Sequence, residues 1–162
     1  EHATVKEALS TFSGVARRFT VVGEVNGITI VDDYGHHPAE IQATLEAAQR
    51  AYGRRLLVVF QPHRYTRTRD VFNELTQAFN AADVLWVTDI YSAGEPPIEG
   101  VSSEGLVQAI RAHGHRDVTY LSASTDIRAA VLERTQPGDV IITLGAGSIT
   151  RLAPELLNAL GH

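Results

Sequence analysis

Short apolar runs alternate along the chain with longer stretches in which apolar residues recur every three or four positions. A run such as Arg55 to Phe60 is typical of a strand that is buried on both faces of a parallel sheet. The spacing from Ile41 to Tyr52 instead favours one face of a helix, and Pro38 suits the first position of that helix. On these criteria we expect strands at residues 18–25, 28–33, 55–60, 83–88, 118–121 and 140–144, and helices at 38–52, 70–81, 103–113, 125–134 and from the turn at 145–147 to about 160.

The order of these elements predicts the fold class. Asn26-Gly27 between the first two strands is a strong hairpin signal, so the domain opens with an antiparallel pair. From there strands and helices alternate, which indicates a mostly parallel sheet with right-handed crossovers and helices on both faces. We therefore expect an α/β, three-layer, Rossmann-like domain with an antiparallel N-terminal hairpin.

Ligands of such sheets bind beyond the carboxyl ends of the strands. Four segments in that position are unusually polar or rich in glycine, namely residues 32–38, 61–69, 89–99 and 145–150. Each of them follows a predicted strand, so we expect the functional groups of the chain to lie on these segments.

Composition narrows the classes of function. The 162 residues, 44% of them hydrophobic, fit one globular domain and contain no apolar run long enough to span a membrane. A net charge of -5 argues against nucleic-acid binding, because neutralising phosphates requires excess basic charge. The chain has no cysteine, which excludes disulfides and thiolate sites. Its single lysine, Lys6, follows no glycine loop, which excludes a Walker motif.

The start of the chain has the features of an internal segment. It begins with Glu1, contains no methionine and shows no signal-peptide pattern. Residues 3–11 have the pattern of the end of a helix. We therefore expect residues 1–11 to be the tail or linker of an upstream region of a longer protein.

Two carboxylates and two imidazoles crowd the segment from Asp32 to Pro38. They could form a polar site in which an aspartate accepts hydrogen bonds from a ribose or orders water on a metal ion. Equally, Asp33 and His37 could simply cap the turn and the helix that follows. A zinc site is less favoured, because adjacent histidines on a turn point in different directions and no His-x-x-x-His helix pair exists.

Three arginines fall within six residues of the segment 61–69, in a protein that is acidic overall. Arg64 and Arg67 are three positions apart, so one helical turn would place them on one side. Guanidinium groups bind carboxylate or phosphate in bidentate fashion. The alternative is a solvated loop. The glycines at 145–147 leave a similar choice, between anion binding by amides at a helix start and a tight turn.

Several motifs, in chain order, resemble the C-terminal domain of the Mur ligases of peptidoglycan synthesis. They are Phe12 to Phe19 (FSGVARRF), Asp32 to Pro38 (DDYGHHP), Phe60 to Thr68 (FQPHRYTRT), Tyr91 to Glu95 (YSAGE) and Gly145 to Gly147. The Tyr-Gly-His-His-Pro and Gly-Ala-Gly motifs are more similar to those of the alanine-adding members than to those of the members that recycle murein tripeptide. Ser148 and the Thr150-Arg151 pair depart from the family pattern. The resemblance covers residues 12–162, which we expect to form the amino-acid-binding domain.

The resemblance implies one domain of a three-domain, ATP-dependent enzyme of the bacterial cytoplasm that serves cell wall biogenesis, cell shape and cell division. In the family, the first domain binds UDP-N-acetylmuramate and the central domain carries the Walker loop and Mg²⁺. The muramyl carboxylate attacks ATP to form an acyl phosphate, which the amine of L-alanine then attacks. The isolated third domain is therefore expected to be inactive and to need its two upstream domains.

The resemblance also implies roles for individual residues. L-alanine is expected to contact His63, Arg64 and Arg67, with His36 and Tyr34 lining the same crevice. Arg18 and Asp33 match positions that contact ATP, the latter through ribose hydroxyls. No catalytic group and no metal site is expected in this chain. Two other classes stay open, a stand-alone nucleotide- or anion-binding module and a His/Asp metallohydrolase.

Overall fold

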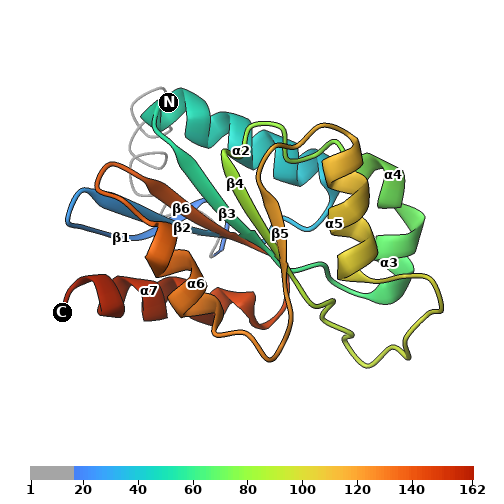
Figure 1. The fold of residues 1–162 in the computed structure, drawn as a ribbon. Coiled ribbons are helices and arrows are strands. Elements are labelled where there is room, and N and C mark those ends of the chain that lie inside the picture. The colour runs from blue at the N-terminus through green and yellow to red at the C-terminus, as the bar shows by residue number, and fades with distance from the viewer. Residues whose placement is uncertain (1–16) are drawn as a thin grey trace, which may run out of the picture.

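The computed structural model describes residues 17–162, which form a six-stranded sheet between two layers of helices (Figure 1). The helix expected at residues 3–11 lies outside the described residues, as does the proposed tail at 1–11. The elements are β1 (Thr20–Val25), β2 (Ile28–Asp33), α2 (Pro38–Tyr52), β3 (Leu56–Phe60), α3 (Tyr65–Asp70), α4 (Phe72–Leu75), β4 (Val84–Thr88), α5 (Ser103–Ala112), β5 (Val118–Leu121), α6 (Ile127–Arg134), β6 (Val140–Leu144), the 3-10 helix η1 (Ser148–Arg151) and α7 (Leu152–Leu160).

The strands lie in the order β1-β2-β6-β3-β4-β5. Only β1 runs antiparallel to its neighbour, and it joins β2 through a hairpin in which Asn26 and Gly27 have φ of 52° and 75°. The remaining neighbours pair in parallel. The predicted fold class is therefore confirmed, including the antiparallel start and the helices on both faces.

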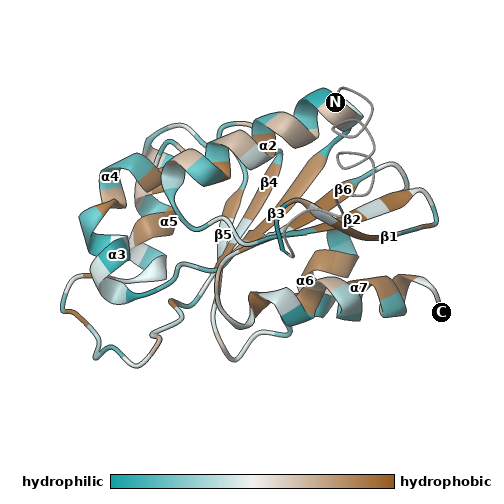
Figure 2. Ribbon diagram, turned by 180° about the vertical axis from the view of Figure 1, so that it is seen from behind, coloured by the Kyte–Doolittle hydropathy of each residue, from teal (hydrophilic) through white to brown (hydrophobic). Residues whose placement is uncertain are grey.

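Alternation along the central strands divides the core in two. In β3, Val58 and Phe60 face the layer of α2, α4 and α5, whereas Leu57 and Val59 face α6 and α7. All five residues of the strand are buried, which is why it reads as a continuous apolar run. Figure 2 shows the consequence, hydrophobic strands inside and hydrophilic positions on the outward surface of α2.

The expectation of one helix at residues 70–81 is wrong. α3 begins well before residue 70, and Val71 separates it from α4, which is a single turn. Beyond α4 the hydroxyl of Thr76 donates to the carbonyl of Asn73 at 2.6 Å, an interaction by which threonine competes with helical hydrogen bonds. Phe79 is nevertheless fully buried, so the apolar spacing identified the buried face correctly.

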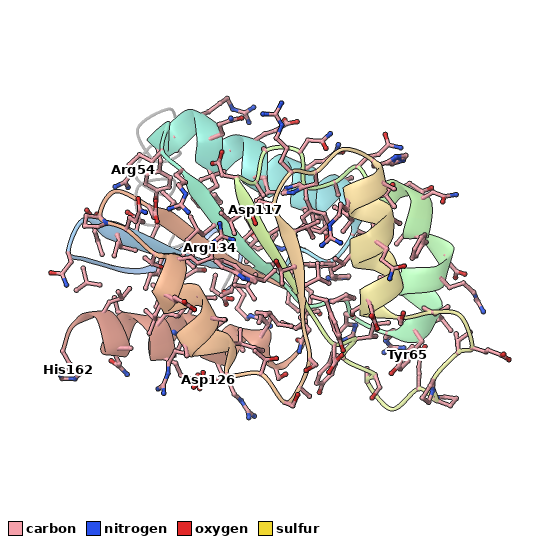
Figure 3. All side chains as sticks on the ribbon, in the orientation of Figure 1. Arg54, Tyr65, Asp117, Asp126, Arg134 and His162 are labelled. Atoms are coloured by element: carbon pink, nitrogen blue, oxygen red, sulfur yellow. The ribbon has the colours of Figure 1, made fainter. Side chains whose placement is uncertain are left out.

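A bidentate ion pair fastens α6 to the start of β5. The guanidinium of Arg134 donates to the two carboxylate oxygens of Asp117, labelled in Figure 3, at 2.9 and 2.6 Å. The same guanidinium lies 5.8 Å from the ring centroid of Trp86. These hydrogen bonds outweigh burial and hold the pKa of Asp117 below its usual range. The pair therefore contributes stability only while the carboxylate stays ionised.

We expect Asp117→Asn to lower the free energy of unfolding by about 0.5–1 kcal/mol near neutral pH, the range of a half-exposed pair. Because its pKa is depressed in the folded chain, the contribution of Asp117 is fully present above an unfolded pKa of about 3.9. This contribution is lost as the pH falls through the pKa of Asp117 in the folded chain. The free energies of unfolding of the unsubstituted chain and of Asp117→Asn should therefore converge in acid. Urea unfolding between about pH 2 and 7 measures this convergence.

The matched control is Asp70→Asn, which removes an exposed pair between neighbouring residues, Arg69 and Asp70, at 2.8 Å. Its effect should stay within about 0.5 kcal/mol at every pH. An Asp117→Asn deficit that is the same at acid and neutral pH would contradict the assignment.

Candidate functional site

The loops that follow β2, β6, β3 and β4 meet at one edge of the sheet. These strands are parallel neighbours, so their carboxyl ends point the same way. An isolated bridge between His63 and Tyr91 extends the pairing of β3 and β4 past their ends. Its hydrogen bonds run from Arg64 N to Tyr91 O and from Tyr91 N to Pro62 O, both 2.8 Å. The structure thus brings together the four segments that the sequence singled out.

Asp32 connects β2 to β6 and to η1. Its Oδ1 accepts a hydrogen bond from the Thr143 hydroxyl at 2.7 Å, and its Oδ2 accepts one from the Thr150 hydroxyl at 2.9 Å. Arg17 Nε donates to the same Oδ2 at 3.2 Å, and Arg17 Nη2 donates to the carbonyl of Gly145 at 2.6 Å. Asp32 is only 4% exposed, so these partners replace the water that its charge would otherwise require.

Asp33 holds the turn after β2. Its Oδ2 accepts from the Phe19 amide and its Oδ1 from the Gly35 amide, both at 2.7 Å. A Cβ at Gly35 would lie 2.7 Å from Oδ1, so glycine permits this close approach. The described geometry gives both oxygens of this buried carboxylate a backbone partner, and the expected contact with the ribose of ATP stays a prediction.

Four aromatic rings from three loops form a cluster at this edge. The centroids of Tyr34 and His36 are 5.1 Å apart in an edge-to-face arrangement, and those of His36 and His63 are 6.0 Å apart. His63 stacks on Tyr91 at 5.4 Å with 17° between the ring planes. Tyr34 and Tyr91 are exposed. Three of the residues expected to line the crevice, Tyr34, His36 and His63, are therefore neighbours.

Arg67 lies against His63 and sets its hydrogen bonding. Arg67 Nη1 donates to His63 Nδ1 at 3.0 Å, and since a guanidinium only donates, Nδ1 is the acceptor. Burial, followed by the charges of Arg67, His36 and Arg64, lowers the pKa of His63, with only Glu95 opposing. His63 is therefore a neutral ring at neutral pH, with its proton on Nε2.

Arg64 stands immediately before α3, with its side chain exposed. Its φ of 71° is a conformation that costs a non-glycine residue of order 1–3 kcal/mol and that persists where the surroundings enforce it. The carbonyl of Arg64 accepts from Thr68 N at 3.1 Å, so the expected helical turn from Arg64 to Arg67 is present. Within residues 17–162 no hydrogen-bond acceptor or carboxylate partners its guanidinium.

Arg18 lies at the rim of the same cluster. Its guanidinium is 5.8 Å from the centroid of Tyr34, and its Nη1 is 3.5 Å from Glu40 Oε1. The guanidinium of Arg17 lies over the same ring at 5.2 Å. Positive charge therefore borders the cluster beside β1 as well as on α3.

Glu95 anchors the start of α3. Its Oε1 accepts from the amide of Thr66 at 3.1 Å and its Oε2 from the hydroxyl of Thr66 at 2.6 Å. These hydrogen bonds hold the pKa of Glu95 below its usual range. The loop after β4 thereby fixes the helix that carries Arg67.

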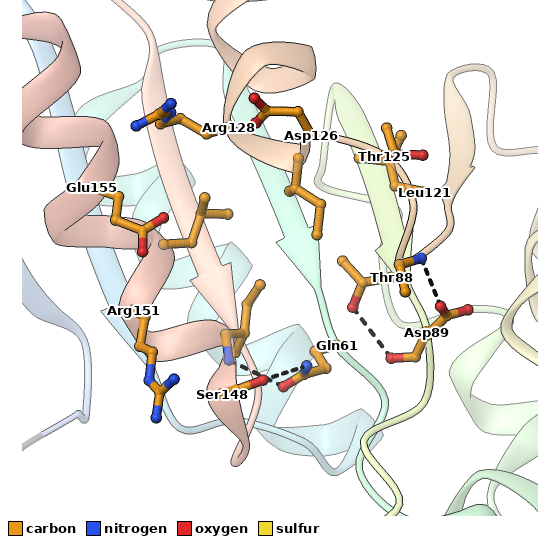
Figure 4. Close-up of a pocket in the computed structure, with 14 residues that line it drawn as sticks. Gln61, Thr88, Asp89, Leu121, Thr125, Asp126, Arg128, Ser148, Arg151 and Glu155 are labelled. Atoms are coloured by element: carbon orange, nitrogen blue, oxygen red, sulfur yellow. Dashed lines mark hydrogen bonds between the residues drawn. The ribbon is translucent and has the colours of Figure 1, made fainter.

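A pocket of ≈ 630 Å³ lies beside this cluster on the layer of α6 and α7 (Figure 4). Gln61 lines this pocket, where its side-chain amide donates to the Ser148 hydroxyl at 3.1 Å and accepts from Ile149 N at 3.1 Å. The far wall is held by Asp89, which accepts from the Tyr120 hydroxyl and from Ala123 N. The hydrogen bond from the Tyr120 hydroxyl to Asp89, together with burial and the negative charge of Asp89, raises the pKa of Tyr120 to about 12.

The imidazoles do not converge on one point. In residues 17–162 no group of three or more His, Asp or Glu side chains is placed to hold a metal ion. The described part of the chain therefore offers no centre of the kind that a His/Asp metallohydrolase requires. Nor does any helix in it combine the length and the apolar character needed to cross a bilayer.

Four positions that shape this edge lie in the motifs quoted above, but their spacing alone does not indicate what they contact. Tyr91 and Glu95 lie in a segment that was singled out, but nothing in their spacing indicates that one stacks on His63 and the other anchors α3. Gln61 and Arg17 act through contacts with residues more than 80 positions away, at Ser148 and Gly145. Only the fold brings these partners together.

Gly147 allows the turn after β6 to approach both Tyr91 and Gln61. A Cβ there would lie 2.6 Å from Tyr91 Cγ and 2.7 Å from Gln61 Oε1. We expect Gly147→Ala to destabilise the chain by about 1–3 kcal/mol, as overpacking does, and to shift the ring resonances of His63. Urea unfolding and NMR spectra measure the two effects.

Gly161→Ala is the matched control, because its Cβ would meet no atom closer than 3.5 Å. It should leave the His63 signals in place. Unchanged His63 and Tyr91 signals in Gly147→Ala would show that the turn yields without disturbing the cluster, against this account.

The sequence and the fold of this chain were compared with those of known proteins, and both resemble one family. Residues 17–147 match the family described as Mur ligase, glutamate ligase domain. A UDP-N-acetylmuramate–L-alanine ligase of Myxococcus xanthus is 59% identical over 157 residues, 97% of this chain and 33% of that relative. The solved UDP-N-acetylmuramate–alanine ligase of Thermotoga maritima has TM-score 0.80 at 24% identity, covering 98% of this chain and 33% of that one. A murein peptide ligase of Psychrobacter arcticus has TM-score 0.75 at 28% identity, with the same coverages.

The chain spans about a third of the length of the curated relatives it matches. The family match nevertheless covers most of the chain and includes β1 to β6 with the loops between them. The chain belongs to the Mur ligase family and contains its C-terminal, glutamate ligase domain.

Proposed function

We propose that this chain is the amino-acid-binding domain of an ATP-dependent ligase that joins L-alanine to UDP-N-acetylmuramate in bacterial peptidoglycan synthesis. The observation that carries the proposal is the 59% identity, across 97% of the chain, to a ligase of that name. In this proposal the ligase acts in the cytoplasm, and two upstream domains hold the UDP sugar, ATP and Mg²⁺.

The chain's own part is to hold the carboxylate of alanine. Among residues 17–162 the guanidinium of Arg64 has no partner, and that of Arg67 uses one nitrogen on His63 and leaves its other donors without one. Two guanidinium groups beside a neutral imidazole N–H form a donor-rich surface that matches a carboxylate. The exposed rings of Tyr34 and Tyr91, with His36, flank it.

Holding the carboxylate would orient the amine of alanine toward the acyl phosphate presented by the other domains. Such positioning turns a bimolecular step into an effectively unimolecular one. Glu95 supports it indirectly by fixing the start of α3. We further propose that Arg18, exposed at the rim, contacts ATP when the domains close. In the same state Asp33, which holds the turn after β2, accepts hydrogen bonds from the ribose hydroxyls of ATP.

The experiment that tests the function is ligase activity of the full-length protein with L-alanine. Release of ADP that depends on UDP-N-acetylmuramate and on L-alanine is the expected result. Activity with a murein tripeptide in place of L-alanine would favour the tripeptide-recycling alternative. Nucleotide binding without ligation by the full-length protein would favour a stand-alone binding module.

Arg64→Ala and Arg67→Ala should each lower kcat/KM for alanine by about 10- to 150-fold, which corresponds to a charge-assisted hydrogen bond of about 1.5–3 kcal/mol. Arg64→Lys should recover only part of the loss, because an ammonium lacks the planar fork. KM for UDP-N-acetylmuramate should change little. Steady-state kinetics of the full-length ligase, with alanine varied, measure these effects.

Arg69→Ala is the control, because Arg69 is an exposed neighbour on α3 that pairs with Asp70. It should leave the kinetics with alanine unchanged. Wild-type kinetics with alanine in both Arg64→Ala and Arg67→Ala would end the assignment of a carboxylate clamp.

A further inference from the structure

Two neighbouring histidine rings differ in the partner of their Nδ1 atom, which is a hydrogen-bond acceptor for one ring and a donor for the other. His36 follows β2 and His63 follows β3, and their centroids are 6.0 Å apart. His36 Nδ1 lies 3.0 Å from the carbonyl oxygen of Tyr34, which can only accept a hydrogen bond. His63 Nδ1 lies 3.0 Å from Arg67 Nη1, which can only donate one.

These partners assign a different tautomer to each ring. A carbonyl oxygen at Nδ1 requires a proton on that nitrogen, so neutral His36 has a lone pair on Nε2. A guanidinium at Nδ1 requires a lone pair there, so neutral His63 carries its proton on Nε2. One ring therefore offers a proton acceptor and the other a hydrogen-bond donor.

No hydrogen bond to the Nε2 atom of either ring forms within residues 17–162. Both residues are partly exposed, and the side chain of His36 is 12% exposed. A ligand bound at this edge would therefore meet both rings.

The two rings have different charged neighbours. Glu40 Oε2, at the start of α2, lies 3.8 Å from His36 Nδ1. The other groups near His36 are Tyr34 and His37 on its own segment and the His63 ring. Burial lowers the pKa of His63, as do the charges of Arg67, His36 and Arg64, and only Glu95 opposes them.

We propose that His36 Nε2 is the base that accepts a proton from the α-ammonium group of the amino acid, while His63 Nε2–H donates a hydrogen bond to the bound substrate. This inference rests on the proposed function, because it requires an amine nucleophile at this edge. An ammonium group has no lone pair, so the nucleophile must lose a proton before it can attack.

The step balances without any further reactant. An N–H bond of the ammonium breaks and an Nε2–H bond forms, which leaves a free amine and an imidazolium. The amine lone pair forms the C–N bond with the acyl carbon, and the C–O bond electrons leave with the phosphate. A second amine proton departs with that phosphate, and the imidazolium releases its proton to water.

The test compares three glutamine variants in the full-length ligase. His36→Gln should lower kcat with alanine by about 100- to 10,000-fold at neutral pH, the usual contribution of a positioned base. The deficit should shrink at high pH, where alanine loses its own proton in solution. With hydroxylamine as the nucleophile, which is largely unprotonated at neutral pH, the loss should be far smaller.

The other two variants separate the roles. His63→Gln retains a donor and should keep the shape of the pH profile while raising KM for alanine. His37→Gln, the adjacent histidine on the turn, should keep both the pH profile and the ratio of amide to hydroxamate products. Nitrogen-15 NMR of the 162-residue chain gives a test without substitution, with His36 expected as the Nδ1–H tautomer and His63 as the Nε2–H tautomer.

The inference is overturned if His36→Gln loses activity equally at all pH values and with both nucleophiles, since that is the behaviour of a positioning residue. Reversed tautomers in the NMR spectra would overturn it independently. A failure of the proposed function looks different, because the unsubstituted full-length protein would then release no ADP in response to L-alanine. If that release is present and His36→Gln behaves as wild type, only the assignment of the base fails.

Discussion

The insertion of β6 between β2 and β3 is the constraint on which the rest of the domain depends. The last strand of the chain pairs in parallel with both neighbours, with Asp32 opposite Thr143 and Phe60 opposite Leu144. To reach that position from β5, the chain must cross on the α6 side, whereas the connections after β2, β3 and β4 cross on the other side. Loops therefore diverge at the carboxyl ends of β6 and β3, where α/β sheets bind their ligands.

The polar contacts at this edge follow from the insertion. Asp32 can reach Thr143 and Thr150 only because β6 lies beside β2, and Gln61 can reach Ser148 only because β6 also lies beside β3. These hydrogen bonds therefore connect the loops that diverge at the carboxyl ends of β6 and β3. The contacts that hold the two imidazole rings are local instead, from the carbonyl of Tyr34 to His36 and from the guanidinium of Arg67 to His63.

The architecture could be predicted from the sequence because buried strands and helix faces have distinct periods. All six strands begin and end within two residues of the expected positions, as with 55–60 against Leu56–Phe60. The helix at 70–81 could not be predicted, since its apolar spacing is correct but Thr76 and the break at Val71 divert the backbone. Local hydrogen-bond competition of this kind leaves the hydrophobic pattern unchanged.

The sequence predicted which segments carry the candidate site, but it predicted few of the contacts that their side chains make. Polar residues after strands identified the segments that carry His36, His63 and Arg67, because the topology of a parallel sheet brings strand ends together. Capping of the turn by Asp33 was one alternative that the sequence offered, but the sequence did not predict that its second oxygen accepts from the Phe19 amide, or that Tyr91 stacks on His63. The tautomers depend on which neighbouring atom meets each ring nitrogen, the carbonyl of Tyr34 for His36 and the guanidinium of Arg67 for His63, and residue spacing does not identify these atoms.

The most direct test of the central claim is the position of L-alanine in a structure of the full-length ligase. We predict that its carboxylate lies within hydrogen-bond distance of the guanidinium groups of Arg64 and Arg67, with its amine toward His36. Alanine bound instead in the neighbouring pocket between α6 and α7, beside Arg128 and Arg151, would contradict the account.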